Sequence, residues 1–117
     1  MGKGFKDLVV WQKAREFAID VYHATEKAPF KRDYGLTNQI RRAAVSVPSN
    51  IAEGDERDTD KDAIRFFYMA KGSLAELRTQ LDISLQINYL DEETFNNFEE
   101  KAIAIGRMLG SLIKARS

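Results

Sequence analysis

The stretch LTNQIRRAAVSVPSNIAEGDE, residues 36–56, has the helical pattern of apolar residues that recurs along the whole chain. Apolar residues recur in it at spacings of three and four, which is the period of an amphipathic helix. They are Leu36, Ile40, Ala43, Ala44, Val47 and Ile51. Pro48 lies inside this pattern and removes the amide that would bond to the Ala44 carbonyl group. We expect one helix kinked at Pro48, with a split into two helices as the alternative.

Three further stretches show the same helical period. The first runs from about Leu8 to Glu26 and is expected to end before Pro29. The second follows a cap at Thr59 and continues to about Asn88, and the third follows a cap at Asp91 and continues to residue 117. No alternating strand pattern is present. The sequence therefore predicts an all-α protein, an antiparallel up-down four-helix bundle formed by residues 1–117 as a single domain.

Composition limits the classes of function. The chain has 117 residues with 18 Lys+Arg, 18 Asp+Glu and no Cys, so disulfides and thiol chemistry are excluded. Every apolar stretch is interrupted by charge well short of the about 18 residues that a membrane span needs. The first residues contain no apolar signal region, and we expect a cytoplasmic protein that does not bind membranes.

Two of the predicted helices carry apolar residues on more than one face. On the helix over residues 36–56 these are Val45, Pro48 and Ala52. On the helix over residues 59–88 they are Phe66, Met69, Ile83 and Ile87, interleaved with Gly72, Ser73, Glu76 and Gln80. A broad core in a thick bundle is one explanation. A subunit interface along these two helices is the other, and we favour it.

A polar stripe follows the opposite flank of the helix over residues 36–56. It consists of Gln39, Arg42, Ser46, Asn50, Glu53 and Arg57. The stripe could be a solvated flank, a buried network or a ligand surface, and Glu53 and Arg57 at i, i+4 can pair with each other. We expect a polar network that fixes the register of the interface, formed by Ser46, Asn50, Glu53, Arg57, Ser73 and Glu76.

Basic residues that could contact the phosphates of RNA or DNA are few. Arg41 and Arg42 are adjacent, and Lys114 and Arg116 lie near the end of the chain. The isoelectric point of about 6.6 argues against binding through a general positive field.

The sequence contains no complete catalytic or metal-binding set. A di-iron bundle needs two carboxylate-x-x-His pairs, and His23 is the only histidine and lies opposite the apolar stripe of its helix. No nucleophile–base set and no phosphate-binding glycine loop can be assembled, so we expect no enzyme and no cofactor. Catalysis through Glu53 and Glu76 is the remaining enzymatic alternative.

The chain resembles the four-helix-bundle family of 23S rRNA intervening-sequence proteins. The matching segments are VSVPSNIAEG (45–54) with QIRRA before it and Arg57 after it, LVVWQKA (8–14), YGL (34–36) and AKGSLAEL (70–77). The resemblance implies a bacterial protein that forms a ring-like homopentamer, and it names no catalytic residues. Some relatives are encoded in 23S rRNA intervening sequences. Others are accessory proteins of diversity-generating retroelements, which associate with nucleic acid and a reverse transcriptase and are markedly more basic than this chain.

Two functional hypotheses follow. The first is a non-enzymatic homo-oligomeric assembly protein, or a nucleic-acid-associated accessory factor. The second is an oligomeric scaffold that binds only proteins.

Overall fold

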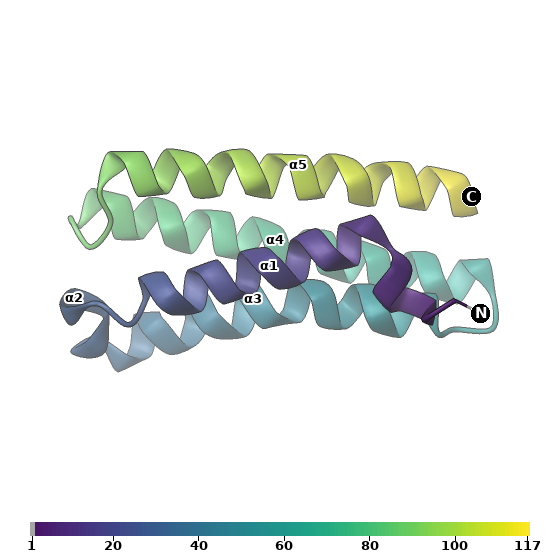
Figure 1. The fold of residues 1–117 in the computed structure, drawn as a ribbon, viewed down its shortest axis with the longest axis horizontal. Coiled ribbons are helices and arrows are strands. Elements are labelled where there is room, and N and C mark those ends of the chain that lie inside the picture. Colours follow the sequence, from purple (N-terminus) through teal and green to yellow (C-terminus); the bar gives the residue numbers. More distant parts are fainter. Residues whose placement is uncertain (1) are drawn as a thin grey trace.

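The computed structural model describes residues 2–117 (Figure 1). The elements are the 3-10 helix η1 (Gly4–Asp7) and the α-helices α1 (Val9–Ala24), α2 (Ala28–Lys31), α3 (Tyr34–Asp55), α4 (Asp60–Gln86) and α5 (Glu92–Arg116). Residues 2–117 contain no strand, so the predicted all-α class is confirmed. The molecule is elongated, with extents of 43 × 23 × 20 Å.

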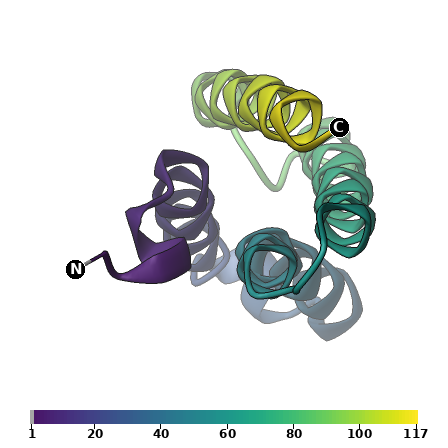
Figure 2. The same cartoon turned by 90° about the vertical axis from the view of Figure 1, so that its right-hand side faces the viewer.

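The four long helices run up and down in chain order and form a bundle. Figure 2, which looks along the helices, shows α1, α3, α4 and α5 arranged in an arc. Each long helix contacts the next one in the chain, and α1 and α5 contact each other on the remaining side. The predicted antiparallel four-helix bundle is therefore confirmed.

The apolar stripes predicted from the sequence line the interior. Ile40, Ile51, Phe67, Leu77 and Leu109 are completely buried. The rings of Phe17 and Phe98 meet edge to face, 5.6 Å apart, and join α1 to α5. Burial of a large apolar side chain contributes about 1.5–3 kcal/mol, so these stripes hold the bundle together.

Polar side chains cap the N-termini of three long helices by accepting hydrogen bonds from amides of the first turn. Thr59 accepts a hydrogen bond from the Asp62 amide, and Asp91 accepts one from the Thr94 amide, as predicted. The Thr94 hydrogen bonds lower the pKa of the Asp91 carboxyl group. Asp33 caps α3 through the Leu36 amide, a cap that the sequence reading did not identify. Helix α3 accordingly begins at Tyr34, two residues earlier than predicted.

The segment after α1 contains a short helix that was not predicted. Helix α1 ends before Pro29, as expected, and Pro29 lies in the first turn of α2, where a missing amide costs nothing. Phe30 is fully buried and packs edge to face against Tyr89. The Tyr89 hydroxyl donates to Asp33, and this hydrogen bond raises the pKa of Tyr89. These contacts tie the loop before α3 to the loop before α5.

Helix α3 is continuous through Pro48, so the alternative of two separate helices is wrong. The kink at Pro48 stays a prediction. Between residues 2 and 117, no helix is long and apolar enough to cross a membrane.

Candidate functional site: the polar groove between α3 and α4

A hydrogen bond between two hydroxyl groups joins α3 to α4 at the centre of the predicted polar stripe. Ser73 Oγ donates to Ser46 Oγ at 2.9 Å. Asn50 Nδ2 donates to the Ser46 carbonyl oxygen at 2.9 Å and to Ser46 Oγ at 3.0 Å. Because the helices are antiparallel, this pairing sets their register and places Glu76 opposite Ala43.

The remaining members of the predicted network form a second, separate group. Glu53 and Arg57 form an ion pair at 3.8 Å, and the Arg57 guanidinium lies 4.4 Å from the centre of the Phe66 ring. Neither side chain bonds to Ser46 or Asn50, and the Glu76 side chain makes no hydrogen bond or ion pair with any residue from 2 to 117. The predicted single network is therefore divided into two parts, with Glu76 outside both.

Beside the Ser46–Ser73 bond, α3 and α4 enclose a polar groove of about 320 Å³. Its lining consists of Gln39, Arg42, Ala43, Ser46, Ser73, Glu76 and Gln80. The side-chain oxygen of Gln80, Oε1, is buried and has no hydrogen-bond donor within the described chain. A buried acceptor without a donor costs about 1–3 kcal/mol.

An apolar stripe follows the outer surface of α4 next to the groove. Met69, Ile83 and Ile87 are 51, 46 and 45% exposed. Their spacing of 14 and 4 residues places them on one helix face, and Glu76 at the intermediate seven-residue step lies between them. The groove therefore has an exposed apolar border, which is the second face predicted for this helix.

Gly72 lies on the same outer side of α4. A Cβ atom at this position would meet no atom of another element within 4 Å. Gly72 also lies in the interior of a helix of 27 residues. The packing of the single chain therefore gives no steric reason for a glycine here.

The predicted interface residues of α3 face the α1 side of the bundle. Arg41, on the same flank, donates from Nε to Thr25 Oγ1 at 2.9 Å and stacks on Tyr22. Val45 is exposed, and Ala52 borders a shallow groove with Phe5. Pro48 is buried within its own chain, and its expected place in a subunit interface stays a prediction.

Comparison with known protein families identifies the family to which this chain belongs. The sequence profile of the 23S rRNA-intervening sequence protein family matches residues 6–111. The chain belongs to this family. The match includes α1, α3, α4 and the groove between α3 and α4, so the resemblance seen in the sequence is confirmed.

Solved structures agree with the family fold. A crystal structure of a protein of unknown function from the S23 ribosomal protein family of Bacteroides thetaiotaomicron is similar, with a TM-score of 0.84 and 23% sequence identity. The similarity covers 91% of this chain and 99% of that chain. The comparison with curated protein sequences gave no significant match.

In this family member, two of the four candidate phosphate-binding residues are held by contacts within the chain, and the other two form no ion pair in the described residues. Arg41 is held by Thr25 and Tyr22, and Arg116 forms ion pairs with Asp55 at 2.8 Å and Asp60 at 3.5 Å. Arg42 and Lys114 form no ion pair with any residue from 2 to 117. The Arg41–Thr25 bond could not be predicted from the sequence, because it depends on how α1 and α3 lie against each other.

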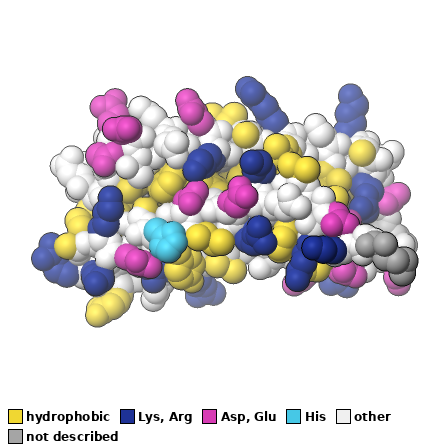
Figure 3. All heavy atoms as spheres, viewed as in Figure 1, with side chains coloured by type: hydrophobic (Ala, Val, Ile, Leu, Met, Phe, Trp, Pro, Cys, Tyr) yellow, Lys and Arg dark blue, Asp and Glu magenta, His cyan; other side chains and the backbone are white. Residues whose placement is uncertain are grey.

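The residues considered for catalysis do not form a site in this family member. In the register set by Ser46 and Ser73, Glu53 and Glu76 lie about 15 Å apart along the bundle, and they border different grooves. They therefore cannot act as a carboxylate pair. His23 is exposed on the face shown in Figure 3, as predicted. The described part of the chain contains no group of three or more potential metal ligands.

Proposed function

We propose that this protein is a non-enzymatic homo-oligomer whose subunits meet through the outer face of α3 and α4. The face comprises the polar groove and the adjacent α4 stripe. The family resemblance favours a ring of five subunits, in which this face would contact a different surface of the next subunit. In this proposal the oligomer is an assembly protein or an accessory factor associated with nucleic acid.

Gly72 is the observation that carries the proposal. A glycine in a helix interior costs roughly 0.5–1 kcal/mol relative to alanine. Nothing in the monomer requires it. A helix of a neighbouring subunit that approaches the α4 backbone closely would require it, because a side chain at residue 72 would block that approach.

The surroundings of Gly72 support the same interface. A neighbouring subunit would cover Met69, Ile83 and Ile87, which are half-exposed in the monomer. It could also place charges against Arg42 and Glu76. Buried polar groups of this kind give an interface its register as well as its affinity.

Substitutions in the α4 stripe test this interface. Met69→Glu places a charge at the centre of the proposed contact, and Gly72→Leu fills the space that the neighbouring helix needs. Both variants are expected to sediment as monomers, whereas Lys71→Glu is the matched control, because Lys71 is exposed on the α5-facing side of α4, away from Met69 and Gly72. Circular dichroism checks that the variants stay helical. Variants that keep the wild-type mass would contradict the proposal.

Nucleic-acid binding is a second candidate, favoured by the absence of ion pairs at Arg42 and Lys114 in the described chain. Titration of labelled RNA and DNA at about 50 and about 200 mM salt tests it, because phosphate contacts weaken steeply with salt. Arg42→Ala is expected to reduce both the affinity and the salt slope, whereas Lys71→Ala serves as the control. Equal binding by both variants would contradict the role of Arg42. No binding at low salt would favour a scaffold that binds only proteins, such as a reverse transcriptase.

A further inference from the structure

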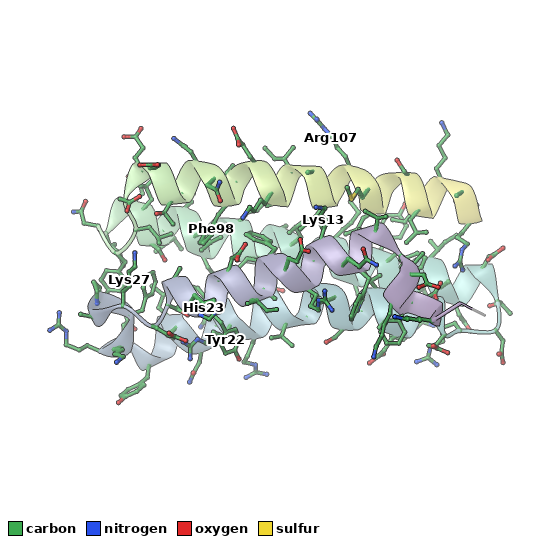
Figure 4. All side chains as sticks on the ribbon, viewed as in Figure 1. Lys13, Tyr22, His23, Lys27, Phe98 and Arg107 are labelled. Atoms are coloured by element: carbon green, nitrogen blue, oxygen red, sulfur yellow. The ribbon has the colours of Figure 1, made fainter. Side chains whose placement is uncertain are left out.

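A second groove lies on another side of the molecule, between α1 and α5. Its volume is about 310 Å³. Phe17 and Ile105, each only 2% exposed, form its floor, and the thioether side chain of Met108 and the methyl group of Ala104 form its α5 wall. Figure 4 shows Lys13 at the space between α1 and α5, whereas Arg107 points away from the bundle. The groove is thus apolar at its base and charged at its rim.

The charges at the rim are not balanced along its length. Lys13 pairs with Glu16 at 3.9 Å, and Lys101 pairs with Asp20 at 2.9 Å, so these four charges neutralise one another. Glu100 borders the groove and has no ion-pair partner in residues 2–117. The rim therefore retains a negative charge on the α5 side.

The groove continues into a shallow acidic depression on the first half of α5. Glu100 borders both concavities, and Glu92 and Glu93 border the depression. Figure 3 shows acidic side chains gathered over this half of α5. The helix dipole accounts for carboxylates in the first turn, such as Glu92 and Glu93, but Glu100 lies two turns further along. The apolar groove between α1 and α5 and the acidic depression on α5 thus form one continuous surface, which we call the track.

We propose that this track binds a basic amphipathic helix of a partner protein. The apolar side chains of such a helix would lie against Phe17, Ile105 and Met108. Its Lys or Arg side chains would face Glu93 and Glu100. From Glu93 to Met108 the track is about 22 Å long, which matches a helix of about 15 residues. Apolar anchors in a groove with complementary charge at its border are the usual way in which a protein binds an amphipathic helix.

A synthetic peptide tests the proposal directly. The probe is a fluorescently labelled helical peptide of about 18 residues in which Leu forms one face and Lys the other. Fluorescence anisotropy is expected to show binding to the wild-type protein that weakens with salt. A peptide of the same composition with the Leu positions scrambled, and a Leu/Glu peptide with the same apolar face, are expected to bind at least about tenfold more weakly.

Variants locate the binding site. Ala104→Arg fills the groove at an exposed position and repels the peptide, and it is expected to weaken binding at least about tenfold. The double variant Glu93→Gln, Glu100→Gln is expected to reduce the salt dependence. Ile103→Arg, on the other flank of α5, is the matched control and is expected to bind normally. Equal binding by Ala104→Arg, or by the scrambled peptide, would overturn the proposal.

The mass of the Ala104→Arg variant separates a partner protein from a second copy of this chain. We expect Ala104→Arg to keep the wild-type oligomeric mass in light scattering, because the track lies away from the proposed α3–α4 interface. A loss of mass would overturn the proposal by showing that another copy of the chain occupies the track. The variants Met69→Glu and Gly72→Leu test the α3–α4 interface separately, so failure of one proposal can be distinguished from failure of the other.

Discussion

At Gly54 the backbone of α3 lies against the ring of Phe67 on α4. A Cβ atom at residue 54 would be 2.6 Å from Phe67 Cε1 and 3.0 Å from the Ala63 carbonyl oxygen. Both neighbours are fully buried, so neither has free space to move into. The glycine therefore permits the close approach of α3 and α4 at this end of the bundle.

Gly54→Ala is expected to lower the free energy of unfolding by about 1–3 kcal/mol, which is the usual cost of overpacking a filled core. Urea unfolding followed by circular dichroism measures the change. Gly110→Ala is the matched control, because a Cβ atom there would meet nothing within 4 Å, and it is expected to stabilise the helix. A neutral effect of Gly54→Ala would mean that Phe67 can move away.

Individual contacts were predictable where they depend on neighbours in sequence. The Thr59 and Asp91 caps and the Glu53–Arg57 pair follow from spacings of three and four residues. The roles of Gly54 and Gly72 were not predictable in the same way. Both are helical glycines, and only the packing of α4 shows that one is enclosed and the other is open.

At the scale of the helices, the apolar period predicted all four long elements because each has one stripe that faces the core. The short elements η1 and α2 were missed, since four residues are too few to show a period. Helix boundaries differed from the predictions by one or two residues where a cap such as Asp33 was not recognised.

The cap of α5 makes a specific contribution to the pH dependence of stability. Because the pKa of Asp91 is lowered in the folded chain, its charge stabilises the fold above the unfolded pKa, and this stabilisation is lost as the pH falls through the folded pKa. Asp91→Asn keeps an acceptor for the Thr94 amide but carries no charge.

The wild type is expected to be more stable than Asp91→Asn at about pH 7, and the difference is expected to shrink progressively below about pH 4. Urea midpoints measured for both proteins down to about pH 2 check this expectation, and other titrating groups cancel in the comparison. A difference that stays constant through the acid range would show that the charge of Asp91 does not stabilise α5.

At the scale of the whole molecule, the sequence predicted which helices carry a second apolar or polar face. It did not predict the grooves on that face or the division of its polar residues into separate groups. The polar stripe of α3 and the Ser73 side of α4 do meet, through the Ser46–Ser73 bond. Three features depend on the separation of neighbouring helices. They are the exclusion of Glu76 from the network, the Gln80 oxygen without a hydrogen-bond donor and the α1–α5 groove. That separation is set by packing across the bundle, which a periodicity in one helix does not encode.

The central claim is that the α3–α4 face joins copies of this chain, and the mass of the wild-type protein in solution tests it most directly. Light scattering coupled to size exclusion, over a concentration series up to high micromolar, is predicted to give a multiple of the 13.3 kDa chain mass, with five copies favoured. A mass of a single chain at the highest concentration would contradict the account, because Met69, Ile83 and Ile87 would then remain exposed to water.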